Sequence, residues 1–349
     1  MTIVDLRSDV LSRPTPPMIE AMMRAAGERT YFGLREDPRQ LELESKIAGL
    51  LGQEDALLFP TCTMANEVAL MLLARPGDIV ATPRDVHIVT SEANAPSILA
   101  GVRVEFVPGD APMPPLAAWE AMARRKGDVQ NAAVTTFAIE NSHNRSGGAV
   151  IDEAATAALA DLAKANGIKL MIDGARLFNA AAALDVAPRD LARHADAVSV
   201  SLNKSLGAPN GAVLAASRAL IERALVLRQR LGGGMRPTGI LAAAGLVAIS
   251  DWQRLREDQR RAQRLADGLG RLAGLAVIAP ATNIVVVVIQ TPGVTPQTLC
   301  ARLASLGVLA LPFGEGRIRM AIYRDIDDDS IALTIAAMAT SLAPGASAA

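Results

Sequence analysis

The chain has 349 residues, of which 50% are hydrophobic and 20% charged, and its 35 basic and 36 acidic residues leave a formal net charge of −1. This composition predicts a compact globular protein with room for one large and one smaller domain, and it excludes a disordered chain. Without a basic excess, neither nucleic acid nor an anionic membrane is an expected partner.

The two cysteines, Cys62 and Cys300, lie far apart and provide neither a disulfide framework nor the spacing of metal ligands. No metal site is therefore expected, and a reducing compartment is indicated. The N-terminus lacks the basic and apolar stretches of a signal peptide. The longest apolar runs, residues 284–289 and 240–249, fall short of the ~18 residues that a membrane span needs. The sequence predicts a soluble, cytoplasmic protein.

The first part of the chain alternates short apolar runs with helical patterns. Helices are predicted over residues 42–51, 64–73 and 153–165. The apolar runs predict strands over residues 56–59, 78–81, 102–107, 131–139, 169–172 and 197–201. Strands that alternate with helices are typical of an α/β fold with a mostly parallel sheet.

A different pattern begins after about residue 235. One long helix is predicted over residues 240–268, charged in its second half. Strands and two helices follow, with the strands over 276–278, 283–290, 308–312 and 317–322 and the helices over 296–305 and 329–342. We expect a large domain over residues 1–238, whose N-terminal segment contributes to the active site. A smaller α+β domain is expected over residues 239–349, with a loose tail from 344.

One lysine stands in a setting suited to covalent chemistry. The predicted strand over 197–201 ends in a polar turn that presents Lys204 among small residues. A Schiff-base lysine needs close quarters, limited water and an amine whose pKa the surroundings lower. On this segment alone, an ordinary loop lysine is the more frequent outcome.

Asp173 ends another predicted strand, 31 residues before Lys204, which leaves room for one helix and one strand between them. A carboxylate at the C-terminal end of a parallel strand lies where α/β sheets bind ligands. Asp173 could be the anionic partner of the pyridine nitrogen of pyridoxal 5′-phosphate (PLP), because a protonated ring is the better electron sink. The alternative is a helix N-cap, which is common in such loops.

Further candidates also follow predicted strands. A short turn leads into a helix whose first backbone N–H groups could bind a phosphate, although threonine is also a frequent N-cap. This turn consists of Thr61, Cys62 and Thr63. His87 and His143 each lie just past a strand and could line the same cleft, whereas His194 is expected to be structural.

Five motifs together identify a family. They are DLRSD at residues 5–9, ENSHN at 140–144, DGARLFNA at 173–180, NKSLGAP at 203–209 and LGGGMR at 231–236. In this order and spacing the chain resembles the PLP-dependent threonine aldolases, within the β-eliminating lyase group of the aspartate-aminotransferase-like fold. The resemblance covers nearly the whole chain. It implies PLP fold type I, with a mostly parallel mixed sheet flanked by helices and a smaller C-terminal α+β domain.

The resemblance also implies roles for the candidate residues. Lys204 would hold PLP as a Schiff base, Asp173 would pair with the pyridine nitrogen, and His87 would stack on the ring. Arg176 would touch the cofactor or the substrate carboxylate. That carboxylate would also be bound by Ser8 and Arg319.

The remaining implied contacts involve the phosphate, the substrate side chain and a second subunit. The phosphate would be held by Thr61, Cys62 and Thr63, helped by Arg236 reaching in from a neighbouring subunit. His143 would lie near the substrate β-hydroxyl, and Tyr31 would contribute to the substrate pocket. The resemblance further implies a homodimer or homotetramer with shared active sites.

Several positions depart from the family's pattern. Cys62 stands where a glycine is usual, and a side chain limits how closely the backbone can approach a phosphate. Gln229 stands where a basic residue often follows Arg228, and the loop around Tyr31 is longer than usual. PLP binding stays the expectation, and the preferred substrate stays open.

The implied reaction is retro-aldol cleavage of a β-hydroxy-α-amino acid, of the threonine, allo-threonine or phenylserine type, to glycine and an aldehyde. A base must take the β-hydroxyl proton, and we expect His87 to do so, with His143 acting through a water as the alternative. Two other functions stay open. One is a PLP-dependent β-eliminating lyase or amino-acid racemase, and the other is a PLP-fold binding protein without catalysis.

Overall fold

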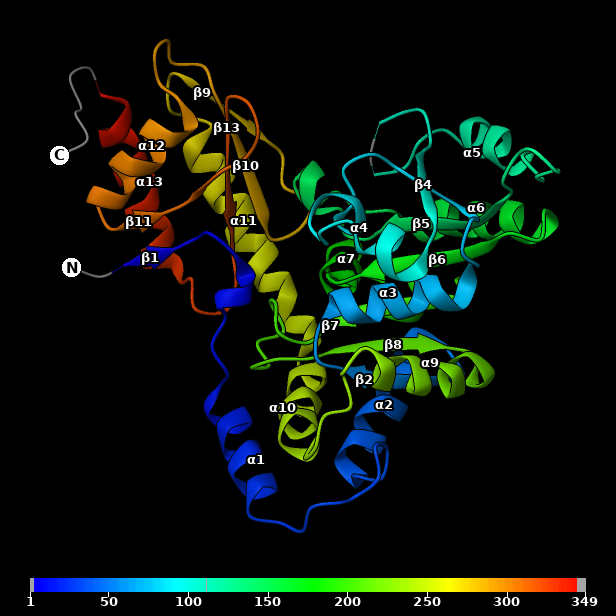
Figure 1. Cartoon of the computed structure of the whole chain (residues 1–349). Helices are drawn as coiled ribbons and strands as arrows, with labels where there is room; N and C mark the ends of the chain where they lie inside the picture. The colour runs from blue at the N-terminus through cyan, green and yellow to red at the C-terminus, as the bar shows by residue number, and fades with distance from the viewer. Residues whose placement is uncertain (1–2, 111, 344–349) are drawn as a thin grey trace.

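The computed structural model describes residues 3–110 and 112–343, so the tail from residue 344 lies outside the described residues. Its centre is a seven-stranded sheet with strand order β2-β8-β7-β6-β5-β3-β4 (Figure 1). These strands all run parallel except β8, which is antiparallel to both of its neighbours. Their bounds are β2 (Asp55–Phe59), β3 (Ile79–Thr82), β4 (Arg103–Phe106), β5 (Val134–Glu140), β6 (Lys169–Gly174), β7 (Ala197–Ser201) and β8 (Ala212–Ala216).

Helices cover both faces of this sheet, which is why strands such as β7 and β8 are buried along their whole length. On one face, α3 (Cys62–Leu73) and α9 (Arg218–Arg230) pack against the sheet. The core on the other face is closed by α2 (Pro38–Leu51), α5 (Leu116–Ala123), α6 (Glu153–Ala165), α7 (Leu177–Leu184), α8 (Pro188–Ala192) and α10 (Gly239–Ser250). The expected mostly parallel mixed sheet flanked by helices is confirmed.

The C-terminal elements form a second, antiparallel sheet with strand order β12-β13-β10-β9. Its strands are β9 (Leu275–Ile278), β10 (Ile284–Ile289), β12 (Leu311–Pro312) and β13 (Arg317–Ala321), and its helices are α11 (Leu255–Leu269), α12 (Pro296–Ser305) and α13 (Asp328–Leu342). The N-terminal strand β1 (Val4–Asp5) pairs in parallel with β11 (Val308–Leu309), on the left in Figure 1. The chain then crosses to α1 (Pro16–Ala26), which packs on α10.

The local sequence explains where several helices begin. α2 and α6 start directly after Asp37 and Asp152, whose carboxylates accept hydrogen bonds from free backbone N–H groups of the first turn. Pro38 then occupies the first helical position, where a missing N–H has no effect on the helix.

The prediction of one helix over residues 240–268 is wrong, because the chain bends at a short 3₁₀ turn, Trp252–Arg254, between α10 and α11. α10 is apolar and packs in the core beside the large sheet, whereas α11 is strongly amphipathic and packs against the C-terminal sheet. The apolar α10 and the amphipathic α11 therefore pack as separate helices against different parts of the molecule. The domain boundary expected after residue 238 stays a prediction.

Within the described ranges, 3–110 and 112–343, no helix combines the length and the apolar character that crossing a bilayer requires.

Candidate active site

The carboxyl ends of parallel strands meet at one edge of a sheet, and most of the expected site residues follow such ends. His87 opens α4 (His87–Thr90) after β3, and His143 follows β5. Asp173 is the second-last residue of β6, Arg176 lies just beyond the strand, and Lys204 follows β7. After β2, Thr61 caps α3, and Cys62 and Thr63 are the first residues of that helix.

Asp173 is buried at the end of β6 and is held from two sides. Its Oδ2 accepts a hydrogen bond of 2.9 Å from Asn66 Nδ2, and its Oδ1 accepts one of 3.0 Å from the backbone N–H of Ala175. The following helix, α7, has Arg176 rather than Asp173 at its N-cap position. The alternative of a helix N-cap is therefore wrong for Asp173, and its carboxylate is fixed beside the site.

Lys204 lies in the turn after β7, with its charge close to three other groups of the site. The positive charge of Lys204 favours the ionised forms of Asp9 and Cys62 and opposes protonation of His87, and so influences the pKa of each. The next residue, Ser205, is buried and donates a hydrogen bond of 3.1 Å to Asp9. The turn that carries Lys204 is thus tied to Asp9 through Ser205.

Arg176 is buried and forms a bidentate ion pair with Asp9 of the N-terminal segment. Its Nε and Nη2 each donate a hydrogen bond of 2.7 Å to one carboxylate oxygen. Burial alone would raise the pKa of Asp9, but the Arg176 guanidinium overcomes this and holds the pKa well below its usual range. Two charged groups without solvent are stable only in such a fully hydrogen-bonded pair.

Asp9 also connects the site to the C-terminal sheet. Asn283, the residue before β10, donates hydrogen bonds to Asp9 Oδ2 at 3.1 Å, to Ser205 Oγ at 3.0 Å and to the carbonyl of Ile322 at 2.9 Å. One carboxylate therefore joins the N-terminal segment, the turns after β6 and β7, and the second sheet. The neighbouring Ser8 caps the short helix Asp9–Leu11 by accepting from Val10 N at 3.3 Å.

Arg319 reaches the same place from β13. Its Nη1 donates to Asn144 Oδ1 at 2.7 Å and its Nη2 to the carbonyl of Arg7 at 3.0 Å, while its buried Nε has no partner among the described residues. Burial, together with the nearby charge of Arg176, lowers the pKa of Arg319 to about 10, so the side chain is still a cation at neutral pH. Two guanidinium groups with donors that no described residue uses are suited to bind a carboxylate.

His143 is fully buried, and burial lowers its pKa to about 4. Its Nδ1 accepts a hydrogen bond of 3.1 Å from the backbone N–H of Ser146, and its Nε2 has no partner in the described part of the chain. Because Nδ1 supplies a lone pair, the proton of the neutral ring must lie on Nε2. The neutral His143 ring can therefore act as a hydrogen-bond donor through Nε2.

His87 has the opposite arrangement. Its Nδ1 lies 2.7 Å from Glu92 Oε1, and this hydrogen bond raises the pKa of His87, opposed by burial. When the ring is neutral, the proton stays on Nδ1 and the lone pair on Nε2 is available. The backbone N–H groups of His87 and Asn144 both donate to Glu140, at 2.7 and 2.9 Å, so one carboxyl group holds both histidine loops in place.

The turn after β2 has the features of an anion site at the start of α3. Thr61 caps this helix by accepting a hydrogen bond of 3.1 Å from Met64 N, which leaves other first-turn N–H groups available. The Cys62 side chain turns toward β7, where its Sγ lies 3.6 Å from Ser199 Oγ. Burial, with the nearby charge of Asp173, raises the pKa of Cys62 to about 12, so the thiol is neutral.

Tyr31 and Arg236 lie on two loops that meet at the surface. The Arg236 guanidinium lies 5.1 Å from the centre of the Phe32 ring, and the Arg29 guanidinium lies 5.9 Å from that of Tyr31. Phe32 is 84% exposed. Within one chain these residues form a surface cluster, and their expected roles stay predictions.

Sequence reasoning missed four residues that organise this site: Asp9, Asn66, Glu92 and Asn283. Asp9 ends the first family motif, and Glu92 follows His87 by five residues. These positions were visible as polar residues near candidate turns. The partners of Asp9, Asn66 and Asn283 were not visible, because their contacts join segments that only the fold brings together.

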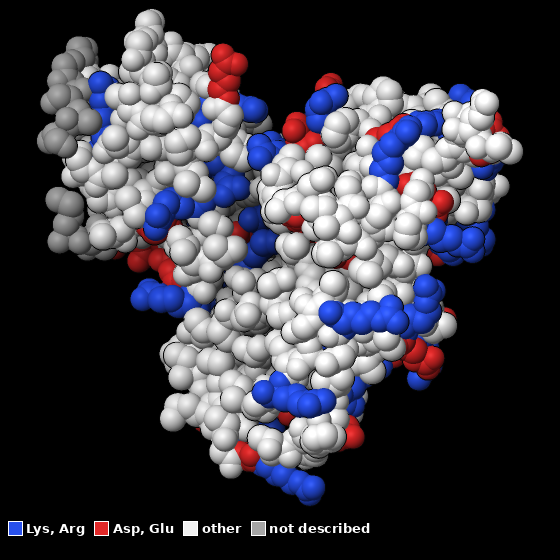
Figure 2. All heavy atoms as spheres, viewed as in Figure 1, with Lys and Arg blue, Asp and Glu red and all other residues white. Residues whose placement is uncertain are grey.

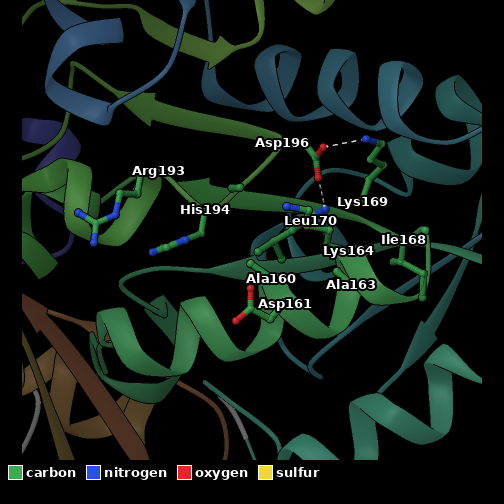
Figure 3. A pocket seen from close by; sticks show the side chains of 12 residues that line it. Ala160, Asp161, Ala163, Lys164, Ile168, Lys169, Leu170, Arg193, His194 and Asp196 are labelled. Carbon is green, nitrogen blue, oxygen red and sulfur yellow. Dashed lines mark hydrogen bonds and ion pairs between the residues drawn. The ribbon is translucent and has the colours of Figure 1, made fainter.

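A hollow of about 480 Å³ lies away from this site, at the amino ends of β6 and β7 (Figure 3). Its twelve lining residues include His194, Lys169 and Asp196, and none is an expected site residue. In contrast, Figure 2 shows lysine and arginine side chains in the hollow between the C-terminal elements and the large sheet. Basic groups there favour an anionic ligand.

The chain is similar to known proteins over most of its length. Residues 5–292 match the family described as beta-eliminating lyase. Low-specificity L-threonine aldolase 1 of Arabidopsis thaliana is 36% identical over 342 residues, covering 96% of this chain and 95% of that protein. The low specificity L-threonine aldolase of Escherichia coli (strain K12) is 33% identical, covering 82% and 84%. Among solved structures, Leishmania major threonine aldolase has a TM-score of 0.84 at 20% identity, covering 97% of this chain and 100% of that one.

We predict that Asp9→Asn destabilises the protein by about 3–5 kcal/mol at pH 7, because it leaves the buried Arg176 charge uncompensated. Denaturant unfolding measures this difference. The ionised Asp9 stabilises the fold above its unfolded pKa, so the difference should shrink as pH falls below about 4. The matched control is Asp5→Asn, whose ion pair with Arg7 is partly exposed and should matter far less. Equal losses in both variants would contradict this account.

We predict that His143 stays neutral with its proton on Nε2 until pH approaches the lowered pKa of about 4. The chain has three histidines, so ¹⁵N ring spectra recorded through a pH titration can resolve them. A proton on Nδ1, or a titration midpoint near the ordinary histidine value of about 6.5, would show that the prediction is wrong.

Proposed function

The chain belongs to the β-eliminating lyase family and, within it, to the PLP-dependent threonine aldolases, and on this premise we propose that it cleaves a β-hydroxy-α-amino acid to glycine and an aldehyde. The reaction needs a cofactor site, a cationic site for the substrate carboxylate and an acceptor for the β-hydroxyl proton. The observation that carries the proposal is the grouping of Lys204, Asp173 and His87 at one edge of the sheet.

The residues of this edge fit PLP in charge and hydrogen-bonding type. Lys204 would bind its aldehyde carbon, and the buried Asp173 carboxylate, held by Asn66, would pair with the pyridine nitrogen. The free N–H groups of α3 and the hydroxyl of Thr63 would hold the phosphate, with Cys62 contributing only a neutral thiol. When bound, PLP supplies an electron sink for the bonds at the substrate Cα.

We propose that Arg319 and Arg176, with Ser8, bind the substrate carboxylate. Arg319 has a buried, unpartnered Nε, and the ion pair with Asp9 fixes the orientation of Arg176. Binding the carboxylate at fixed cations orients the rest of the amino acid, and this orientation selects the Cα bond that breaks. His143 Nε2–H would donate to the β-oxygen region, and Tyr31 would border the side-chain pocket.

We propose His87 as the acceptor of the β-hydroxyl proton. Its hydrogen bond to Glu92 leaves the lone pair of the neutral ring on Nε2, whereas His143 Nδ1 is already used by Ser146. The two histidines therefore differ in tautomer, and this difference favours His87 for proton acceptance and His143 for hydrogen-bond donation.

We also propose a cytoplasmic homodimer or homotetramer with shared active sites. Two apolar side chains are largely exposed, Phe32 in the Tyr31 loop at 84% and Met23 on α1 at 71%. Such exposure supports a protein interface at these residues. Arg236, which lies over Phe32, would then reach the phosphate of a neighbouring subunit. The two free cysteines are consistent with a reducing compartment.

We expect Lys204→Ala to abolish the visible absorbance of the PLP-reconstituted protein and the release of glycine from threonine, because Lys204 supplies the amine of the proposed Schiff base. The wild type is assayed with threonine, allo-threonine and phenylserine for both glycine and aldehyde. The control is Lys169→Ala, whose lysine pairs with Asp196 at the opposite end of the sheet. Release of a keto acid instead of glycine would favour a β-eliminating lyase.

We expect His87→Asn to lower kcat for aldehyde release by about 10²–10⁴-fold, the usual contribution of a general base. His143→Asn keeps a hydrogen-bond donor and should have a smaller effect. Steady-state kinetics of both variants compare the two roles. The assignment fails if His87→Asn turns over normally while His143→Asn is inactive.

A further inference from the structure

Two buried glutamates lie near His87: Glu92, its hydrogen-bond partner, and Glu67, which has no part in the chemistry described so far. Glu92 follows α4 and is 4% exposed, and Glu67 lies on α3 and is 1% exposed. Buried carboxyl groups are rare unless they are paired or hydrogen-bonded. Their surroundings therefore need a physical explanation.

Glu92 is tied to both candidate cofactor contacts. Its Oε1 lies 2.7 Å from His87 Nδ1 and accepts a hydrogen bond of 2.9 Å from Asn66 Nδ2. The same Asn66 nitrogen donates to Asp173 Oδ2 at 2.9 Å. One imidazole nitrogen of His87 and one oxygen each from Glu92 and Asp173 all lie within 4.8 Å of one another. In so compact a group, the gain or loss of one proton changes the electrostatic energy of all three side chains.

Glu67 is the candidate hydrogen-bond partner for Oε2, the second carboxylate oxygen of Glu92. Both oxygens of Glu67 and Oε2 of Glu92 are buried and receive no hydrogen bond from any donor in the described residues. Glu67 is the residue after Asn66, which itself donates to Glu92 Oε1, and burial together with the charge and hydrogen bonding of Glu92 raises the pKa of Glu67 to about 8. Two ionised carboxylates in contact without solvent repel strongly, whereas one proton between them satisfies both groups.

We propose that Glu92 is a positioning residue for His87, and that one proton shared between Glu67 and Glu92 leaves a single negative charge, not two, behind the His87 ring. This inference rests on the proposed function, because it concerns the group assigned there as proton acceptor. Glu92 fixes the ring so that Nε2 faces the site with its lone pair. Glu67, in its protonated form, donates to Glu92 Oε2 and keeps that carboxylate in place.

The charge state of His87 then depends on a defined set of neighbours. Glu92 contacts the ring directly, and the backbone N–H of His87 donates to Glu140. Asp173 favours the protonated ring, and the cation of Lys204 opposes it. The titratable groups to consider are therefore Glu92, Glu67, Asp173, Glu140 and Lys204.

The test compares two substitutions of the same chemistry, Glu92→Gln and Glu67→Gln. Glu92→Gln removes the negative charge, so the titration midpoint of His87 should fall by about one pH unit or more. Glu67→Gln keeps an N–H donor toward Glu92 and thus imitates the shared proton, so the midpoint should stay close to that of the wild type. Ring ¹⁵N spectra of the full-length, PLP-loaded protein measure both midpoints.

Three outcomes would overturn the proposal. If Glu67 carried its own charge, both substitutions would lower the His87 midpoint by similar amounts. If Glu92 had only a packing role, its replacement would leave the midpoint unchanged. Infrared difference spectra provide a measurement that needs no variant at position 92: the wild-type spectrum minus that of Glu67→Gln should contain a protonated-carboxyl band, and the absence of this band from the difference would contradict the shared proton.

The kinetic readout separates this inference from the proposed function. The acid limb of the pH profile for glycine release should move to lower pH in Glu92→Gln, and it should stay in place in Glu67→Gln. If the wild type released no glycine from any β-hydroxy amino acid, the proposed function would fail. The His87 midpoints and the infrared band would still decide whether the proton is shared.

Discussion

The buried ion pair between Asp9 and Arg176 is the interaction on which the rest of the site depends. Neither charge can lose its partner without a large penalty, because almost no solvent reaches either group. This requirement holds the N-terminal segment against the turn after β6. Through Ser205 and Asn283, the same carboxylate also fixes the turn after β7 and the start of β10. The segments that carry the proposed cofactor-binding and substrate-binding residues are therefore all held by the Asp9 carboxylate.

The surroundings give chemically identical side chains different tasks. His143 is buried without a carboxylate partner and stays neutral, with its proton on Nε2. His87 bonds to Glu92, which favours its protonated form and keeps its lone pair on the other nitrogen. The carboxyl groups differ in the same manner, since Asp9 faces a guanidinium and Glu67 faces another carboxylate. Partner and burial, not residue type, decide the protonation state.

The sequence predicted the parts of the fold that depend on local patterns. The helices over 153–165 and 296–305 and the strand over 197–201 have the predicted bounds, because capping residues and continuous apolar runs mark their ends. The long helix over 240–268 was wrong, and β8 was not predicted. Both errors have one cause: alanine-rich and apolar segments take the conformation that their packing partners require, and local periodicity does not reveal those partners.

By itself, the sequence determined which chemistry-bearing residues stand at strand ends, since apolar runs followed by polar turns mark the carboxyl edge of a parallel sheet. It thereby indicated Lys204, Asp173, His87 and His143 without any coordinates. Only the tertiary structure decided how they are held. Asn66 meets Asp173 across 107 residues, and Arg176 meets Asp9 across 167. Contacts of this range depend on how layers stack, and the protonation of each group depends on the burial and charges that this stacking creates.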